Sequence, residues 1–266
     1  MCCGRKANRW PTSFLEEMEY SYGAPIGNWN AAMAVMNNTF FGAMTPGLIS
    51  RTLNATHLAD PTYVNLTLCT SATAPEAFAL TSSGSHIVFL NTGLDGPSLF
   101  SAERAPDGSI LSCSSWTGDA TNTCASAAHF TMRPFDWDKV VLLCDDVISG
   151  GNSTVYLTQS SGSSFSVLNV TKLHPSSSDY EMLAAPGFGF PFYTTFGNRL
   201  ESYGLGLDGT SLELVDDIPT STRTSNVGLV IPPTRTHLLF GSSYFLHPRQ
   251  IDIWERLTAA PTLFDP

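Results

Sequence analysis

The sequence predicts an all-β protein, an antiparallel β-sandwich of jelly-roll type preceded by a short helical N-terminal segment. Charged residues make up only 14% of the 266 residues, while the chain contains 21 Gly, 17 Pro and 16 Phe. This composition is poor in helix formers and rich in residues that favour strands and turns. From about residue 60 onward, short alternating segments are separated by clusters of Gly, Ser, Asn and Asp, which is typical of successive β-strands.

We expect two parts along the chain, an N-terminal arm over residues 1–40 and a single β-sandwich domain over residues 41–266. A chain of this length can bury one large hydrophobic core. Within the domain, residues 92–127 and 173–191 show no sustained periodicity, which predicts two long loops. Loops of this length inside a compact domain are usually functional or contact a partner.

The arm contains the only convincing helical pattern. Ser13 and Glu16 fit a capping box that opens a short helix, because each side chain can accept a hydrogen bond from the other residue's backbone N–H. Asn28 would cap a second helix, in which Met33 and Met36 fall on one face. We expect these helices to pack on the core or on a neighbouring molecule.

The expected strands are short and follow one another closely. They span residues 62–69, 76–81, 86–91, 128–133, 139–144, 153–159, 164–170, 191–196, 202–215, 226–231 and 236–246, and residues 249–257 fit either a strand or a short helix. Short connections at 149–152 and 160–163 make residues 138–171 a meander of three strands. The sequence has no visible internal repeat, which counts against a propeller or a solenoid.

Six cysteines stand at positions 2, 3, 69, 113, 124 and 144, and their spacing matches no metal site beyond the adjacent first pair. A disulfide between Cys113 and Cys124 could close a polar loop, whereas free buried cysteines are an equally good interpretation of Cys69, Cys113, Cys124 and Cys144. Cys2 and Cys3 lie beside a small basic cluster. They could carry two acyl chains, although a free tail is the favoured interpretation.

Because the formal net charge is −10, we expect no direct nucleic-acid binding by this body. Binding to phosphates requires clustered Lys and Arg, and here the only basic cluster is formed by Arg5, Lys6 and Arg9. No stretch of 18 apolar residues occurs, so we expect no transmembrane segment. The N-terminus also lacks the apolar region of a signal peptide.

The segment GLGLDG matches G-x-G-x-x-G at Gly204, Gly206 and Gly209, the pattern of a dinucleotide-binding turn. That turn needs a helix after it, because the helix N-terminus binds the pyrophosphate. Here the next residues, TSLELV, alternate as in a strand, and no acidic residue follows at the distance required for the ribose. A hairpin turn at Asp208 and Gly209 is therefore expected, with no cofactor.

The segment TQSSGSSF at 158–165 resembles the Asp-box hairpin of sialidase-like propellers. Thr158, Gly162, Ser164 and Phe165 fit that pattern, but Ser160 stands in place of the defining aspartate. Because one degenerate box covers only eight residues and the repeats of a propeller are missing, we interpret the segment as an ordinary glycine-containing hairpin.

Three pairs of aspartates are candidates for catalytic carboxylates. Asp136 and Asp138 flank Trp137, and further pairs stand at 145–146 and 216–217. A glycosidase places two carboxylates across the bond that it cleaves, and a tryptophan could stack on the sugar. Acidic residues at strand ends are more often turn formers, and no calcium-loop spacing is present. No nucleophile or zinc-protease motif occurs, so we assign no catalytic, cofactor-binding or metal-binding residue.

Three functions remain as hypotheses. The low charge and the lack of a catalytic motif favour a non-enzymatic structural protein, such as a viral coat subunit that packs against copies of itself or related chains in a virion. The second is an extracellular binding module for carbohydrate or protein, supported by the loop aromatics Trp116 and Trp137 and by sequons at 37, 54, 65, 152 and 169. The third is a glycan hydrolase that uses an aspartate pair.

Overall fold

The structure is a computed structural model that describes residues 33–36, 39–44, 47–52, 59–69, 75–91, 98–116, 124, 129–145, 152–175, 183–185, 189, 191–196, 199–219, 226–230, 237–243 and 251–257. Nineteen β-strands make up this part of the chain. They are β1 (Met33–Met36), β2 (Thr39–Met44), β3 (Gly47–Thr52), β4 (Thr62–Asn65), β5 (Ala77–Leu80), β6 (His86–Asn91), β7 (Ser98–Arg104), β8 (Ile110–Trp116), β9 (His129–Pro134), β10 (Lys139–Asp145), β11 (Asn152–Ser161), β12 (Ser164–Pro175), β13 (Leu183–Ala184), β14 (Phe192–Phe196), β15 (Arg199–Leu205), β16 (Leu212–Pro219), β17 (Asn226–Val230), β18 (His237–Ser243) and β19 (Ile251–Leu257).

The strands form five antiparallel sheets, each built from consecutive strands. Sheet 1 contains β1–β4, sheet 2 contains β5–β8, sheet 3 contains β9–β12, sheet 4 contains β13–β16 and sheet 5 contains β17–β19. Each sheet is a meander in which every strand pairs with the next one along the chain, as short turns between antiparallel neighbours allow. The predicted all-β antiparallel class and the three-stranded meander at 138–171 are confirmed.

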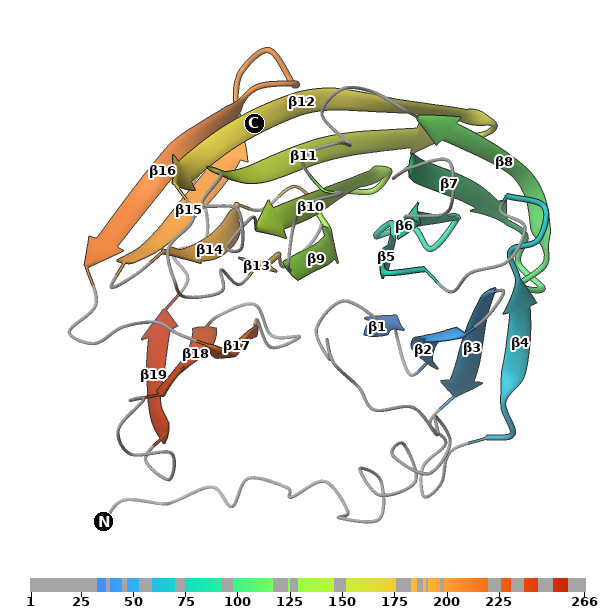
Figure 1. The fold of residues 1–266 in the computed structure, drawn as a ribbon, viewed down its shortest axis with the longest axis horizontal. Coiled ribbons are helices and arrows are strands. Elements are labelled where there is room, and N and C mark those ends of the chain that lie inside the picture. Colours follow the sequence, from blue (N-terminus) through green and yellow to red (C-terminus); the bar gives the residue numbers. More distant parts are fainter. Residues whose placement is uncertain are drawn as a thin grey trace, which may run out of the picture.

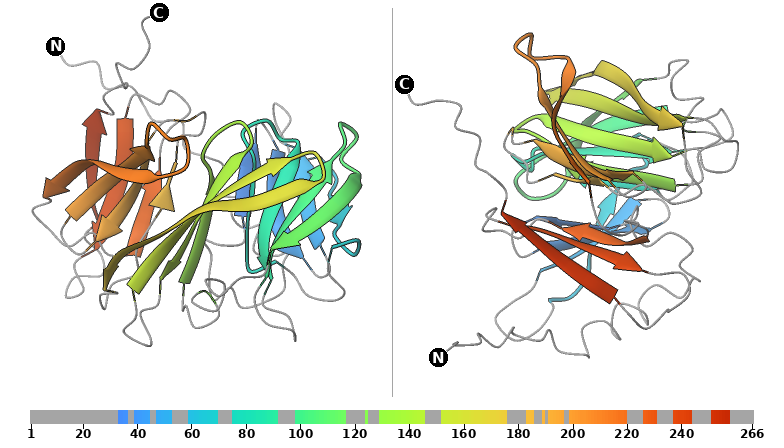
Figure 2. Two further views of the ribbon diagram at one scale, coloured as in Figure 1. Left: turned by 90° about the horizontal axis from the view of Figure 1, so that it is seen from above. Right: turned by 90° about the vertical axis from the view of Figure 1, so that its left-hand side faces the viewer.

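The five sheets are arranged radially (Figure 1), with the first strand of each sheet on the inside and the last on the outside. The inner strands of successive sheets contact one another in the order β1, β5, β9, β13 and β17. In the two views of Figure 2 the sheets stand side by side with their faces turned toward their neighbours. This is a propeller-like arrangement, and it replaces the expected sandwich of two stacked sheets.

Apolar side chains from facing sheets fill the space between them. In sheet 2, Ile87 and Phe89 pack toward sheet 1, whereas Val88 and Leu90 pack toward sheet 3. All six residues of β6 are buried, because a sheet enclosed on both faces needs a continuous apolar run rather than alternation. A third cluster fills the space between sheets 3 and 4. The core is therefore divided among the interfaces between neighbouring sheets.

Three expectations from the sequence are corrected. The second predicted helix is wrong where the structure describes it, since Met33–Met36 forms β1 and pairs with β2. Tertiary pairing overrides the helical pattern here, while the first helix, opened by Ser13, lies outside the described residues. The expected loop at 92–127 contains β7 and β8, and the expected loop at 173–191 contains the end of β12 and the short strand β13.

The cysteines of the sheets form two disulfides. Cys69 is bonded to Cys113, which joins the end of sheet 1 to β8, and Cys124 is bonded to Cys144 in β10. The considered bond between Cys113 and Cys124 is therefore not formed, and these four cysteines are not free. Among the described residues, no helix is long and apolar enough to cross a bilayer.

Candidate functional site

The glycine motif at 204–209 is the expected hairpin turn between β15 and β16. Gly209 has a φ of 70°, a conformation that glycine adopts without strain. The Asp208 Oδ1 atom accepts hydrogen bonds from the backbone N–H groups of Ser211 and Thr210 and from the Ser211 hydroxyl. These bonds lower the pKa of Asp208 to about 2. The glycines therefore serve the turn, and the strand that follows confirms the hairpin prediction.

The segment at 158–165 is also a hairpin, as predicted, and connects β11 to β12. Ser160, which replaces the aspartate of an Asp box, is buried, and its hydroxyl lies 2.7 Å from the hydroxyl of Ser101 in β7. The carbonyl oxygen of Gly162 lies 2.9 Å from Nε2 of the buried His86. Both contacts join sheet 3 to sheet 2, so this hairpin fixes the position of neighbouring sheets.

The turn between β9 and β10 is held by three sheets. Backbone N–H groups of other segments donate to its successive carbonyl oxygens: Ser82 to Asp136 (3.2 Å), Ser83 to Trp137 (3.1 Å), Ser160 to Asp138 (2.9 Å) and Gly189 to Phe135 (2.8 Å). In an antiparallel meander the first and third connections lie at the same end of the sheet, which is why these turns meet. The turn is thus fixed from sheet 2, from its own sheet 3 and from the β13–β14 connection of sheet 4.

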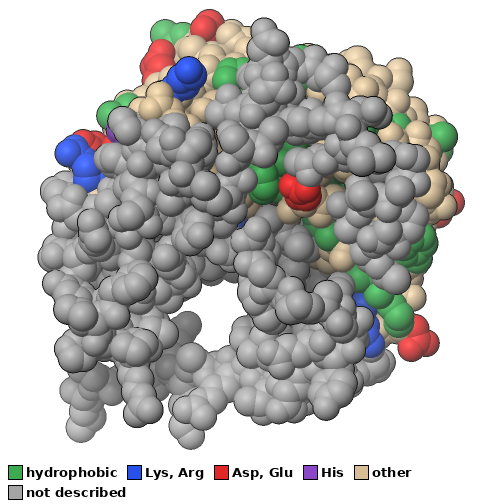
Figure 3. All heavy atoms as spheres, viewed as in Figure 1, with side chains coloured by type: hydrophobic (Ala, Val, Ile, Leu, Met, Phe, Trp, Pro, Cys, Tyr) green, Lys and Arg blue, Asp and Glu red, His purple; other side chains and the backbone are tan. Residues whose placement is uncertain are grey.

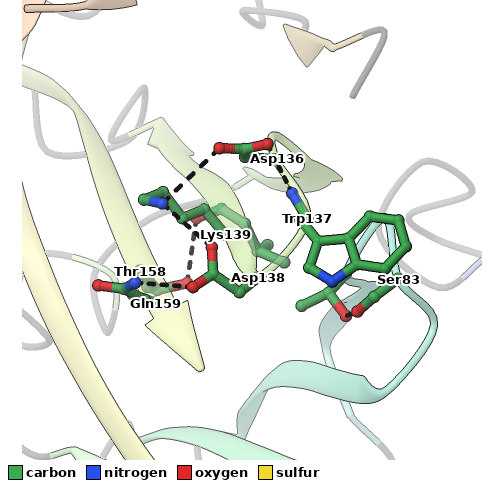
Figure 4. A network of polar contacts seen from close by, with 9 residues as sticks. Ser83, Asp136, Trp137, Asp138, Lys139, Thr158 and Gln159 are labelled. Atoms are coloured by element: carbon green, nitrogen blue, oxygen red, sulfur yellow. Dashed lines mark hydrogen bonds and ion pairs between the residues drawn. The ribbon is translucent and has the colours of Figure 1, made fainter. Parts of the chain in front are cut away.

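The side chains of this turn form a polar network (Figure 4). The Lys139 Nζ atom lies 3.0 Å from Asp138 Oδ1 and 3.7 Å from Asp136 Oδ2. Gln159 in β11 donates to Asp138 Oδ2 at 2.7 Å, and the Trp137 backbone N–H donates to Asp136 Oδ1 at 2.7 Å. One lysine therefore balances two carboxylates, and both carboxylates help to hold the turn.

The indole of Trp137 lies outside this network. Its side chain is on the side of Ser83 and the β5–β6 turn, away from Lys139, and the residue is 63% exposed. A tryptophan is usually buried to a large extent. The structure instead keeps this ring at the surface of a turn whose backbone is fixed at four successive carbonyl groups.

The electrostatics of the network oppose acid catalysis by Asp138. Burial acts to raise the pKa of Asp138, but hydrogen bonds from Gln159 and Lys139, together with the charge of Lys139, outweigh it and lower that pKa. A glycosidase needs one carboxyl group whose pKa is raised, so that it can protonate the leaving group. Asp138 is therefore poorly suited to be the proton donor of a glycosidase.

The other aspartate pairs lie elsewhere. Asp145 is buried at the far end of β10, about 20 Å along the strand from Lys139, and accepts a hydrogen bond from Ser153. Asp217 in β16 is paired with Arg199, and Asp216 accepts from the backbone of Asp217. The structure does not bring the three pairs together, and Asp146 lies outside the described residues.

Sequence reasoning singled out Trp137 and its two aspartates but missed their partners. Gln159 could have been found, because the predicted meander places β11 beside β10, and Lys139 is directly opposite Gln159. Ser83 and Gly189 come from other sheets, and no local signal identifies them. A further buried cluster was also missed, in which Tyr203 and His174 both contact Glu201 Oε2 at 2.7 Å and link sheet 4 to sheet 3.

The described residues contain no group of three or more His, Cys, Asp or Glu arranged to hold a metal ion. On the face shown in Figure 3, the described Lys and Arg side chains lie apart from one another and form no cluster.

Comparisons with known proteins show similarity in fold. No protein-family model matches the sequence, and no curated protein matches it significantly. The solved structure of a Bacteroides uniformis protein, provisionally assigned as a 6-phosphogluconolactonase, is similar with a TM-score of 0.53 and 13% identity, over 84% of this chain and 65% of that chain. At this identity the likeness concerns the fold alone.

Two other solved structures are more distant. TolB from Acinetobacter baumannii has a TM-score of 0.47 and 12% identity, over 83% of this chain and 49% of that chain. Sqt1 from Saccharomyces cerevisiae has a TM-score of 0.46 and 8% identity, over 81% and 58%. The chain thus spans less than two thirds of the length of each of these three proteins.

The hypothesis of a viral coat subunit is wrong. It depended on a jelly-roll sandwich, whereas the chain forms radial sheets and is similar in fold to the Bacteroides protein. The sequence argument failed because low charge and many short strands are shared by both architectures.

Proposed function

We propose that this chain is a propeller-like binding module without enzymatic activity, and that the turn between β9 and β10 presents Trp137 to a carbohydrate ligand. The observation that carries the proposal is the exposed indole on a backbone fixed by three sheets. A backbone held in place before binding loses little conformational freedom on contact with a ligand. The turn is therefore prepared to present the indole to a ligand.

The side chains of this turn support a neutral, hydroxyl-rich ligand. The face of an indole packs well against apolar C–H surface, and its N–H is a hydrogen-bond donor. Asp136 and Asp138 lie next to the ring in sequence, and both are partly exposed. Carboxylate oxygens keep acceptor positions for hydroxyl groups beyond those used by Lys139 and Gln159. Because the chain is acidic overall, a neutral sugar is favoured over an anionic one.

The same network supports binding without catalysis. The pKa of Asp138 is lowered rather than raised, and the carboxylate accepts hydrogen bonds from Lys139 and Gln159. Both groups favour its ionised form. A carboxylate in this state can orient a sugar hydroxyl but is a poor proton donor at neutral pH.

Binding to an array of neutral glycans, followed by calorimetry with the best ligand, tests the proposal. Trp137→Ala is expected to weaken binding at least about tenfold, the effect of removing one buried aromatic contact. The matched control is Leu207→Ala, which truncates a fully exposed side chain of the β15–β16 turn and should leave affinity unchanged. Failure of the wild type to bind any glycan, or equal binding by Trp137→Ala, would contradict the proposal.

The disulfides support a second part of the proposal, an extracellular location. Disulfides persist in oxidising environments and are rare in the cytosol, and this chain contains Cys69–Cys113 and Cys124–Cys144. Alkylation of non-reduced protein from its natural source, read by mass spectrometry, should leave these four cysteines unmodified. Modification of all four would oppose this location.

A further inference from the structure

Arg133 places a partly buried positive charge near the inner edge of sheet 3. Arg133 lies in β9, the innermost strand of that sheet, and donates from one guanidinium nitrogen to the Met132 carbonyl oxygen at 2.8 Å. Burial lowers the pKa of the Arg133 guanidinium to about 10, so the group stays charged at neutral pH. Within the described part of the chain, no ion pair involves Arg133.

Arg133 shares its strand face with an unpaired hydroxyl. Thr131 is two residues away, so both side chains project from the same face of β9. Arg133 is opposite Val141 and Thr131 is opposite Leu143, and both of these β10 residues belong to the core between sheets 3 and 4. Thr131 is completely buried, and its hydroxyl has no hydrogen-bond partner among the described residues.

A second unpaired hydroxyl comes from the opposite side of the same interface. Thr194 in β14 is completely buried, and its hydroxyl also has no hydrogen-bond partner among the described residues. It lies opposite Leu183 of the inner strand β13, and Leu183 belongs to the same core cluster. The inner strands β9 and β13 contact each other, and β14 is next to β13, so all three side chains project into the interface between sheets 3 and 4.

The carboxylate on this face of sheet 4 does not balance Arg133. Glu201 is opposite Thr194, but its Oε2 atom is bound by Tyr203 and His174. A buried hydroxyl without a hydrogen bond carries a free-energy cost, and two such hydroxyls face the same interface as the partly buried Arg133 cation. These groups are all donors that could serve one acceptor with a negative charge.

We propose that Arg133, Thr131 and Thr194 form a binding site for a small oxyanion in the interface between sheets 3 and 4. A guanidinium can donate two parallel hydrogen bonds to a carboxylate or a phosphate group. The two hydroxyls would donate to the remaining oxygen atoms of the same group. This site is separate from the Trp137 turn and does not depend on the proposed carbohydrate binding.

Calorimetric titration and thermal unfolding with inorganic phosphate and with acetate, at constant ionic strength, test the proposal and distinguish the two kinds of oxyanion. A saturable rise in the unfolding temperature is expected for at least one of them, because a ligand that binds only the folded state stabilises it. Arg133→Met should abolish this response. Arg199→Met changes an exposed arginine that pairs with Asp217 and should retain it.

The double variant Thr131→Val/Thr194→Val provides a second test that does not remove the charge. Loss of hydrogen bonds to a charged ligand should weaken anion binding at least about tenfold. In buffer without oxyanions its unfolding temperature should stay the same or rise, since the unpaired hydroxyls are replaced by methyl groups of similar shape. The absence of a saturable response in the wild type, or equal anion affinity in Arg133→Met or the double variant, would overturn the proposal.

Discussion

Asp138 shows how one residue connects local structure to the candidate site. Its backbone carbonyl accepts from Ser160, and its carboxylate accepts from Lys139 and Gln159. Sequence reasoning identified it as half of an acidic pair beside a tryptophan. The structure assigns the carboxylate a positioning role in the turn, because its hydrogen bonds join β10 to β11 next to Trp137.

This role predicts a pH-dependent contribution to stability. Because the pKa of Asp138 is lowered in the folded state, its stabilising effect is present above the ordinary carboxyl pKa of about 3.9 and is lost as the pH falls through the folded value. Asp138→Asn should therefore reduce the free energy of unfolding at pH 7 by about 1 kcal/mol, a modest value because the site is partly solvated. Urea unfolding at pH 7 and pH 3 measures the effect.

The control for this prediction is Asp60→Asn, which changes an exposed carboxylate outside the network. It should alter the unfolding free energy little at either pH. The difference between wild type and Asp138→Asn should shrink at pH 3. A difference that is equal at both pH values would show that the Asp138 charge does not stabilise the turn.

At the scale of single residues, the sequence identified Trp137 as a candidate but did not identify most of the residues that hold its turn. Gln159 follows from the β10–β11 register, whereas Gly189 approaches the turn through a contact between different sheets. No sequence pattern pointed to Arg133 as a candidate site residue, because a charged residue near a strand end is usually solvated. Only the radial packing turns this face of β9 toward sheet 4.

At the scale of elements, hairpins were predictable because turn chemistry is local. Gly209 and Gly162 both have positive φ values at the expected turns. The prediction failed where partners are distant in sequence. Met33–Met36 pairs with β2 instead of forming a helix, and β8 has no fully buried residue to mark it as a strand.

The disulfides illustrate the same limit. Cys113 and Cys124 are close in sequence, and a bond between them would have closed a short loop. Their actual partners, Cys69 and Cys144, are separated from them by 44 and 20 residues. The spacing of the cysteines alone does not reveal such pairs, since pairing depends on which segments of the chain the sheets bring together.

At the scale of the whole molecule, the all-β class could be predicted from the sequence, whereas the arrangement of the sheets could not. A strand that is buried on both faces, such as β6, is compatible with a sandwich core or with a sheet enclosed by two neighbours. The lack of a sequence repeat then counted against a propeller, although the sheets repeat in topology. Similar meanders can be built from unrelated sequences, because each interface needs apolar volume rather than particular residues.

The radial order of the sheets is the central claim, since both the Trp137 turn and the Arg133 site require sheet 3 to lie between sheets 2 and 4. Ser101 in β7 and Ser160 in β11 are buried with their hydroxyl oxygens 2.7 Å apart, whereas the buried Ser202 belongs to β15 of sheet 4. The double variant Ser101→Cys/Ser160→Cys should form a new disulfide between sheets 2 and 3 in mild oxidant, because side chains this close can be bridged. Peptide mapping under non-reducing conditions measures this disulfide. The control is Ser101→Cys/Ser202→Cys, which should form no disulfide between the two introduced cysteines. No bond in the first variant, or an equal yield in both, would contradict the radial order.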